Sequence, residues 1–255
     1  MEWRSLSSMG GIEQRLQVLA AMRKKHLAQL ESNVLDPGKD KGGAATTSLA
    51  STLRFLAVAE FKLEGDVEGF RRLLGRSACY RLGLFKRSMN GESIPSSYLA
   101  MVSYRYLLDA LASGDHELAK ELASVMGGRK AIEDENDHPF DRALGYAIKS
   151  LVLDADDKVE KIKQLKEVLR APYGNDFVGY AEALEAIVSM DSGLFQDALE
   201  RLLVGHKRQC RKGGVFKDSE DEILCVWGAG LIGLAKSRGL LVRIEDPLLP
   251  AALTA

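Results

Sequence analysis

Histidine and cysteine are the side chains most often used as metal ligands, nucleophiles or proton carriers. The chain has four histidines, His26, His116, His138 and His206. No two of them form an HxxxH or HExxH pair, so their spacing predicts no metal site. His26 falls on a helical stripe and is expected to be structural, whereas His116 and His138 adjoin turns and are expected to be solvated. His206, beside a basic run, is the histidine that we retain as a candidate.

The three cysteines, Cys79, Cys210 and Cys225, form no CxxC pair. Their odd number and wide separation predict neither a disulfide framework nor a zinc site, and they favour a reducing cytosol. No serine lies in a GxSxG elbow, and no cysteine has an evident base nearby in the sequence. We therefore expect a protein that is not an enzyme, with no catalytic residues, no metal and no cofactor. An active site assembled from distant residues stays open at this point.

Residues Gly228–Gly233 spell GxGxxG, which imitates the dinucleotide-binding fingerprint. The fingerprint needs a strand before the glycines and a sheet around them, and the preceding chain is typical of helices. A helix explains the segment better. Ser219 and Glu222 match a capping box, and apolar residues then recur at helical spacing as far as Gly239. On this interpretation the glycines form a thin helix face that lets a neighbouring helix pack closely.

Acidic residues gather in three places that are candidates for contact with a basic partner. The densest is segment 133–141, which has no lysine or arginine and holds Glu133, Asp134, Glu135, Asp137 and Asp141. The second is a turn that contains Asp154, Asp156 and Asp157. The third, residues 218–222, is expected to open a helix, where acids stabilise the dipole. We predict partner binding for the first two sets and expect segment 133–141 to project as a loop between two hairpins.

Basic residues form two runs, within 71–87 and within 207–217. They are candidate contacts for RNA or an acidic partner, although solvated helix faces explain them as well. The 35 basic and 36 acidic residues leave a net charge of −1, which argues against a dedicated nucleic-acid binder. We expect a protein partner and no nucleic acid.

Helical periodicity extends through almost the whole chain. Apolar residues recur at three- and four-residue spacing near the N-terminus, which predicts a first helix over 12–31. A polar, glycine-rich stretch, 39–48, predicts a flexible loop. No segment alternates with a period of two for long enough to predict a strand. The expected fold class is therefore all-α.

Two periodic stretches joined by a turn rich in Gly and Asp form a pattern that repeats four times within residues 49–210. The turns are 64–66, 113–115, 154–156 and 191–193. Repeats of this period are typical of helical hairpins stacked into an array. Two of them resemble the tetratricopeptide hairpin, because Ala119 and Ala198 follow the turn glycine by five residues. We expect stacked antiparallel hairpins with a C-terminal capping helix and tail over 218–255, and Trp227 buried against the fourth hairpin.

A length of 255 residues suits one domain or two small ones, and we expect a single all-helical domain over 1–255. Residues 1–11 contain no basic stretch followed by an apolar one, so no secretory signal is predicted. No apolar run approaches the roughly 18 residues that a membrane helix needs. We expect a cytoplasmic protein that does not contact a membrane.

The C-terminal third of the chain resembles the polymorphic-toxin immunity proteins known as Immunity protein 49. The resemblance is carried by a histidine, a glycine pair, an acidic stretch, a Trp-Gly pair and a proline-containing tail: His206, Gly213–Phe216, Asp218–Leu224, Trp227–Gly228, Leu234–Gly239 and Asp246–Pro250. The helical repeats match that family in general style.

The resemblance implies a bacterial protein that protects its producer by binding a cognate toxin domain and blocking it. An alternative is a helical-repeat scaffold that binds a peptide or a regulatory protein in its concave face. A third hypothesis is a hydrolase that reverses a toxin modification.

Overall fold

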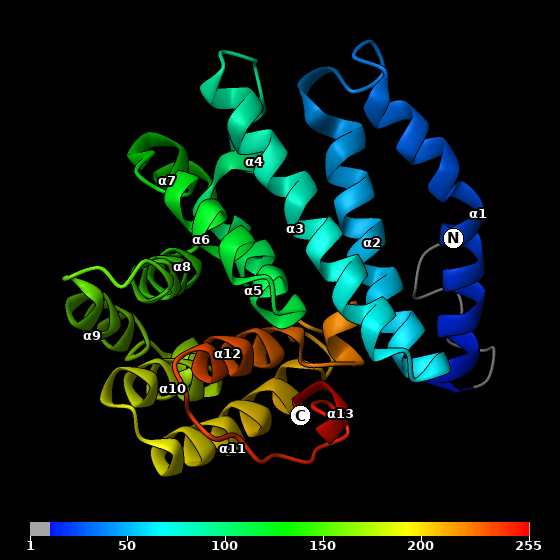
Figure 1. Cartoon of the computed structure of the whole chain (residues 1–255). Coiled ribbons are helices and arrows are strands. Elements are labelled where there is room, and N and C mark those ends of the chain that lie inside the picture. The colour runs from blue at the N-terminus through cyan, green and yellow to red at the C-terminus, as the bar shows by residue number, and fades with distance from the viewer. Residues whose placement is uncertain (1–10, 255) are drawn as a thin grey trace.

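The regular structure of this chain is helical. A computed structural model describes residues 11–254, and over that range it contains α-helices and 3₁₀ turns but no β-strand (Figure 1). The expected all-α fold class is confirmed. None of the described helices is both long and apolar enough to cross a membrane. The segment searched for a secretory signal lies, except for Gly11, outside the described residues.

Thirteen α-helices follow one another within the described range. In chain order they are α1 (Ile12–Leu35), α2 (Ala44–Glu64), α3 (Val67–Met89), α4 (Ser96–Leu99), α5 (Tyr104–Ser113), α6 (His116–Val125), α7 (Lys130–Asn136), α8 (Pro139–Val152), α9 (Lys158–Val168), α10 (Val178–Ser189), α11 (Ser192–Gln209), α12 (Val226–Ser237) and α13 (Ala251–Thr254).

The four predicted turns each join two helices that contact one another, as the pairs α2–α3, α5–α6, α8–α9 and α10–α11. The chemistry of these turns is local. Gly65 and Gly114 end their helices in the left-handed conformation, with φ of 69° and 83°. Asp66, Asp115 and Asp191 then cap the next helix by accepting hydrogen bonds from its first free N–H groups. Short-range sequence signals therefore locate the hairpins correctly.

The flexible loop expected over 39–48 is wrong. Helix α2 begins at Ala44, and Asp40 is buried with 1 % of its surface exposed. The Asp40 carboxylate accepts hydrogen bonds from the backbone and hydroxyl of Thr46 and pairs with Arg87. One buried acid therefore orders a stretch that its polar and glycine-rich composition marks as mobile. Helix α1 also runs four residues beyond the expected end at residue 31.

Helix α12 does not cap the end of the array. It turns back into the curve of the helices and packs mainly on α5, with further contacts to α10 and α11 (Figure 1). Nine of the twelve residues of α12 are buried, and a helix that is apolar on all sides needs neighbours on all sides. The C-terminal helix thus fills the space between the second and the fourth hairpin.

The glycines of the GxGxxG segment lie within helix α12, as expected. An ideal Cβ at Gly230 would sit 2.6 Å from the carbonyl oxygen of Leu108, and one at Gly233 would sit 2.2 Å from that of Leu111. Both carbonyls belong to α5, so the two backbones touch along this face. The predicted thin helix face is therefore present, and its neighbour is α5.

The capping box predicted at Ser219 and Glu222 does not form. These residues belong to a 3₁₀ turn (Glu220–Glu222) and its N-cap, and α12 begins only at Val226. The Ser219 hydroxyl donates to the carbonyl of Phe216 instead of capping a helix.

Trp227 is buried, with 2 % of its surface exposed, as predicted. Its ring makes edge contacts with Phe216 at 5.1 Å, Tyr104 at 5.2 Å and Tyr180 at 5.8 Å between ring centroids. Tyr180 belongs to the fourth hairpin, whereas Tyr104 belongs to α5 of the second. One aromatic side chain on α12 therefore joins two hairpins that are distant in sequence.

Replacing Gly233 with alanine should destabilise the fold, because the added methyl group meets the backbone of α5 and forces the helices apart. Overpacking of this kind costs about 1–3 kcal/mol. Gly83→Ala is the matched control, because Gly83 also lies inside a helix and an added Cβ meets nothing within 4 Å. That change should stabilise by roughly 0.5–1 kcal/mol. Denaturant unfolding of the two variants measures both effects, and equal stabilities would contradict the close packing of α12.

Candidate functional site

The acidic segment 133–141 is not a projecting loop, which corrects the sequence-based expectation. Its first half is helix α7, and Glu133 is buried with 3 % of its surface exposed. The Glu133 carboxylate accepts hydrogen bonds from the Tyr146 hydroxyl at 3.0 Å and from the Arg129 backbone at 2.9 Å. This acid holds α7 against α8 and is not available to a partner.

Asp137 and Asp141 also have structural partners. The two oxygens of Asp137 accept the backbone N–H groups of Met101 and Val102, each at 2.8 Å. Burial raises the pKa of this carboxyl above its ordinary value, against the opposing effect of those two hydrogen bonds. Asp141 accepts a hydrogen bond from the Tyr104 hydroxyl at 3.0 Å. Both acids fix the chain where it enters α5.

The remaining predicted partner-binding acids are exposed. On α7, Asp134 pairs with Lys130 and Arg142, and Glu135 lies in solvent beside it. In the turn between α8 and α9, Asp154 pairs with Lys158 and Arg238. The other two acids of that turn, Asp156 and Asp157, are exposed. The structure thus separates the eight predicted acids into a structural group and two exposed groups.

His206 is buried in the interior rather than poised for chemistry. Its Nε2 lies 2.6 Å from the carbonyl oxygen of Asp221, and its ring stacks on Phe216 at 4.1 Å. Burial lowers the pKa of the imidazole below 6.5, so the ring is neutral at neutral pH. His26, expected to be structural, is exposed instead. His138 is exposed, as expected, and accepts a hydrogen bond from the Phe140 backbone.

Most members of the two basic runs are held in ion pairs within the chain. In the run 71–87, Arg76 pairs with Glu31 and Arg87 with Asp40 and Glu92. In the run 207–217, the pairs are Lys207–Asp246, Arg208–Asp176 and Lys217–Glu222. These pairs support the interpretation of the runs as charged helix faces.

One buried cluster of charges links three distant segments. The Arg54 guanidinium of α2 donates to Asp109 of α5 at 3.0 Å, to Asp221 at 3.0 Å and to Glu220. Arg54 is 6 % exposed and Asp109 is fully buried. Burial raises the pKa of the Asp109 carboxyl to about 7, despite the opposing effect of Arg54. One oxygen of that carboxylate has no hydrogen-bond partner among the described residues.

Arg54 also lines a pocket of about 310 Å³, which we call the arginine pocket. Five stretches of chain contribute to it: α2, α3, the stretch from α4 into α5, residues 215–221 and α12. Its lining residues are Thr47, Ser51, Arg54, Arg81, Tyr98, Val102, Ser103, Arg105, Tyr106, Val215, Phe216, Ser219, Glu220, Asp221 and Trp227. A concave site with aromatic walls and a few converging polar groups is the usual form of a ligand site.

Arg81 is the residue of this pocket that sequence reasoning missed. It is 4 % exposed, and its Nε and Nη2 both donate to the same oxygen, Ser103 Oγ, at 3.3 and 2.8 Å. The guanidinium lies over the rings of Tyr98 and Tyr106, at 5.6 and 5.0 Å from their centroids. No carboxylate of the described residues lies within 4 Å of it. In the sequence Arg81 is one cation among six in a basic run, and only its burial distinguishes it.

No group of three or more His, Cys, Asp and Glu side chains within residues 11–254 is arranged to hold a metal ion. Comparison of the chain with protein-family models, with curated proteins and with solved structures finds no match.

Changing Asp137 to asparagine should destabilise the protein, because one of its two acceptor oxygens becomes an amide that faces a backbone N–H. Leaving such a group unsatisfied costs about 1–3 kcal/mol. Glu135→Gln, on the exposed side of the same segment, should change stability by less than about 0.5 kcal/mol. Thermal or denaturant unfolding measures both. Equal effects would show that the acids of this segment act as one solvated surface.

The Asp109 carboxyl should make stability depend on pH. Between pH values of about 4 and about 7, the folded protein keeps a proton on Asp109 that the unfolded chain releases. This residue therefore lowers the free energy of unfolding as the pH rises through that range. Asp109→Asn removes the effect. The free energy of unfolding of the variant, minus that of the wild type, should rise by roughly 2–4 kcal/mol from pH 4.5 to pH 7.5, given ~1.4 kcal/mol for each pKa unit.

The comparison of Asp109→Asn with the wild type at each pH isolates this carboxyl from His206, whose lowered pKa reduces stability as pH falls below 6.5 in both proteins. Denaturant unfolding across the pH range is the measurement. A stability difference that does not change with pH would show that Asp109 is ionised throughout.

Proposed function

We propose that this chain is a bacterial immunity protein that neutralises a cognate toxin domain by stoichiometric binding in the cytoplasm. The proposal starts from the resemblance of the C-terminal third to Immunity protein 49. The observation that supports it is a mixed acidic and apolar surface at the turns of the third and fourth hairpins. We call this surface the turn edge, and it consists of Asp154, Asp156, Asp157, Met190, Leu194 and Leu241.

The turn edge exposes large apolar side chains together. Met190 and Leu194 flank the α10–α11 turn, and each exposes 55 % of its surface. Leu241 of the C-terminal tail exposes 76 %, and its backbone donates to the hydroxyl of Ser192 at 3.1 Å, between those two residues. Grouped exposed apolar side chains with a polar rim are typical of protein interaction surfaces.

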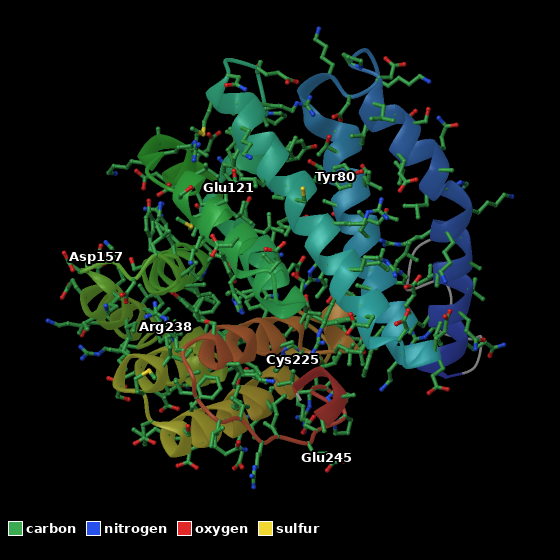
Figure 2. The ribbon with its side chains drawn as sticks, in the orientation of Figure 1. Tyr80, Glu121, Asp157, Cys225, Arg238 and Glu245 are labelled. Carbon is green, nitrogen blue, oxygen red and sulfur yellow. The ribbon has the colours of Figure 1, made fainter. Side chains whose placement is uncertain are left out.

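The acidic turn between α8 and α9 is tied to the same edge by Arg238. Arg238 lies three residues before Leu241 in the chain, and its guanidinium donates to Asp154 at 3.1 Å and to the carbonyl of Leu151. Figure 2 shows Asp157 and Arg238 on the same side of the molecule. Acids at the rim of an apolar patch suit a partner whose own patch is rimmed by lysine and arginine, and they accelerate its encounter.

The test uses the product of the gene adjacent to this one, which the proposal expects to encode the toxin, with binding measured as association and dissociation rates at low and high salt. Asp156→Asn combined with Asp157→Asn should slow association by about 3–10-fold at low salt and flatten its salt dependence. Leu194→Ser combined with Leu241→Ser should mainly accelerate dissociation, by about tenfold or more. Stability should change by less than about 0.5 kcal/mol for the charge variant.

The exposed acids of α7 supply the matched control. Asp134→Asn combined with Glu135→Gln removes the same charge from a different face and should leave both rates within about twofold, because screening limits distant charges. If this α7 variant slows association while the turn-edge variant does not, the contact lies on α7. If the neighbouring toxin does not bind the wild type, the immunity proposal is wrong.

A further inference from the structure

Two residues that line the arginine pocket carry buried hydrogen-bond donors that the protein itself does not satisfy. The Nε1 of Trp227 is buried and has no acceptor among the described residues, and the buried Thr47 hydroxyl has no partner among them either. Both residues line the pocket with Arg81. An indole N–H can only donate, so its natural partner is an oxygen that enters the pocket.

The contrast between the two buried arginines of this pocket identifies what is missing. Arg54 is paired with Asp221 and Glu220 and also donates to Asp109, whereas Arg81 contacts one hydroxyl and the faces of two tyrosine rings. Tyrosine faces compensate a buried guanidinium only in part. A buried charge without a counter-ion is costly, and such a charge facing a pocket favours an anion there.

The carboxylates that line the pocket do not cancel this preference. Glu220 and Asp221 are both engaged by Arg54, while Arg105 pairs with Asp141 at 3.8 Å and lies over the Trp227 ring at 5.4 Å from its centroid. Three arginines therefore face two acids across the lining. The unpaired positive charge among them is that of Arg81.

We propose that the arginine pocket binds a small organic oxyanion, a carboxylate or a phosphate monoester, through Arg81, Trp227 Nε1 and the Thr47 hydroxyl. The walls of Tyr98, Tyr106 and Phe216 hold the apolar or aromatic body of the ligand. A volume of about 310 Å³ suits a molecule of the size of a substituted benzene ring. This inference does not rest on the immunity proposal, because the pocket and the turn edge share no residue.

The test measures melting temperature and calorimetric binding with four probes: inorganic phosphate, phenyl phosphate, acetate and benzoate, each against sodium chloride at the same ionic strength. The wild type should bind phenyl phosphate or benzoate more tightly than the corresponding ion without a ring. Preference for one of the two ring-bearing probes identifies phosphate or carboxylate as the recognised group.

Arg81→Met is the decisive variant. It replaces a buried unpaired charge with an apolar side chain of similar length, so the melting temperature without ligand should stay the same or rise, and the response to the anions should vanish. Trp227→Phe keeps the packing and removes the N–H, and it should weaken binding by about 3–10-fold, as for the loss of one hydrogen bond. Thr47→Val should act in the same direction.

Arg76→Met is the matched control, because Arg76 lies on the same helix, pairs with Glu31 and does not line the pocket. Its response to the anions should equal that of the wild type. A lower melting temperature of Arg81→Met without ligand, together with an unchanged response to all probes, would show that Arg81 is structural. Failure of all four probes to bind the wild type beyond the chloride control would overturn the proposal.

Discussion

The fold depends on the need to bury helix α12 on every side. Residues 226–235 contain almost no polar side chain, and a helix of this kind is stable only inside other helices. The second and fourth hairpins therefore pack against it, and its glycines let α5 approach to backbone contact. Trp227 then reaches from α12 to the second and fourth hairpins at once. A helical array that would otherwise present an open inner face is closed by its own C-terminal segment.

This closure shapes both surfaces that we connect with function. Because α12 occupies the interior, a peptide could enter the curve of the array only by displacing it, which disfavours the scaffold alternative. The tail that follows α12 instead runs outward and completes the turn edge through Arg238 and Leu241. At the other end of α12, Trp227 and the segment before it complete the arginine pocket. The C-terminal segment thus contributes to each candidate site.

Local signals in the sequence predicted what depends on local chemistry. Three of the four turns follow from Gly65, Gly114 and the capping aspartates, whose effects act within a few residues. The positions of α12 and of the ordered stretch near Asp40 depend on partners far along the chain, such as Leu108 and Arg87. The composition of the local segment does not predict such distant contacts. The burial of Glu133 was missed for the same reason, because its partner Tyr146 lies on the next helix. Arg81 looked like any other member of a basic run until its surroundings were known.

Hydrogen exchange of the α12 backbone amides tests the central claim most directly. If α12 is the interior around which the hairpins are built, its amides should exchange only through global unfolding, with the same free energy as denaturant unfolding and with the slowest amides of α5. Exchange of α12 at a markedly lower free energy than α5 would contradict this account. It would show that the helix opens separately and that the inner face of the array can be exposed to a partner.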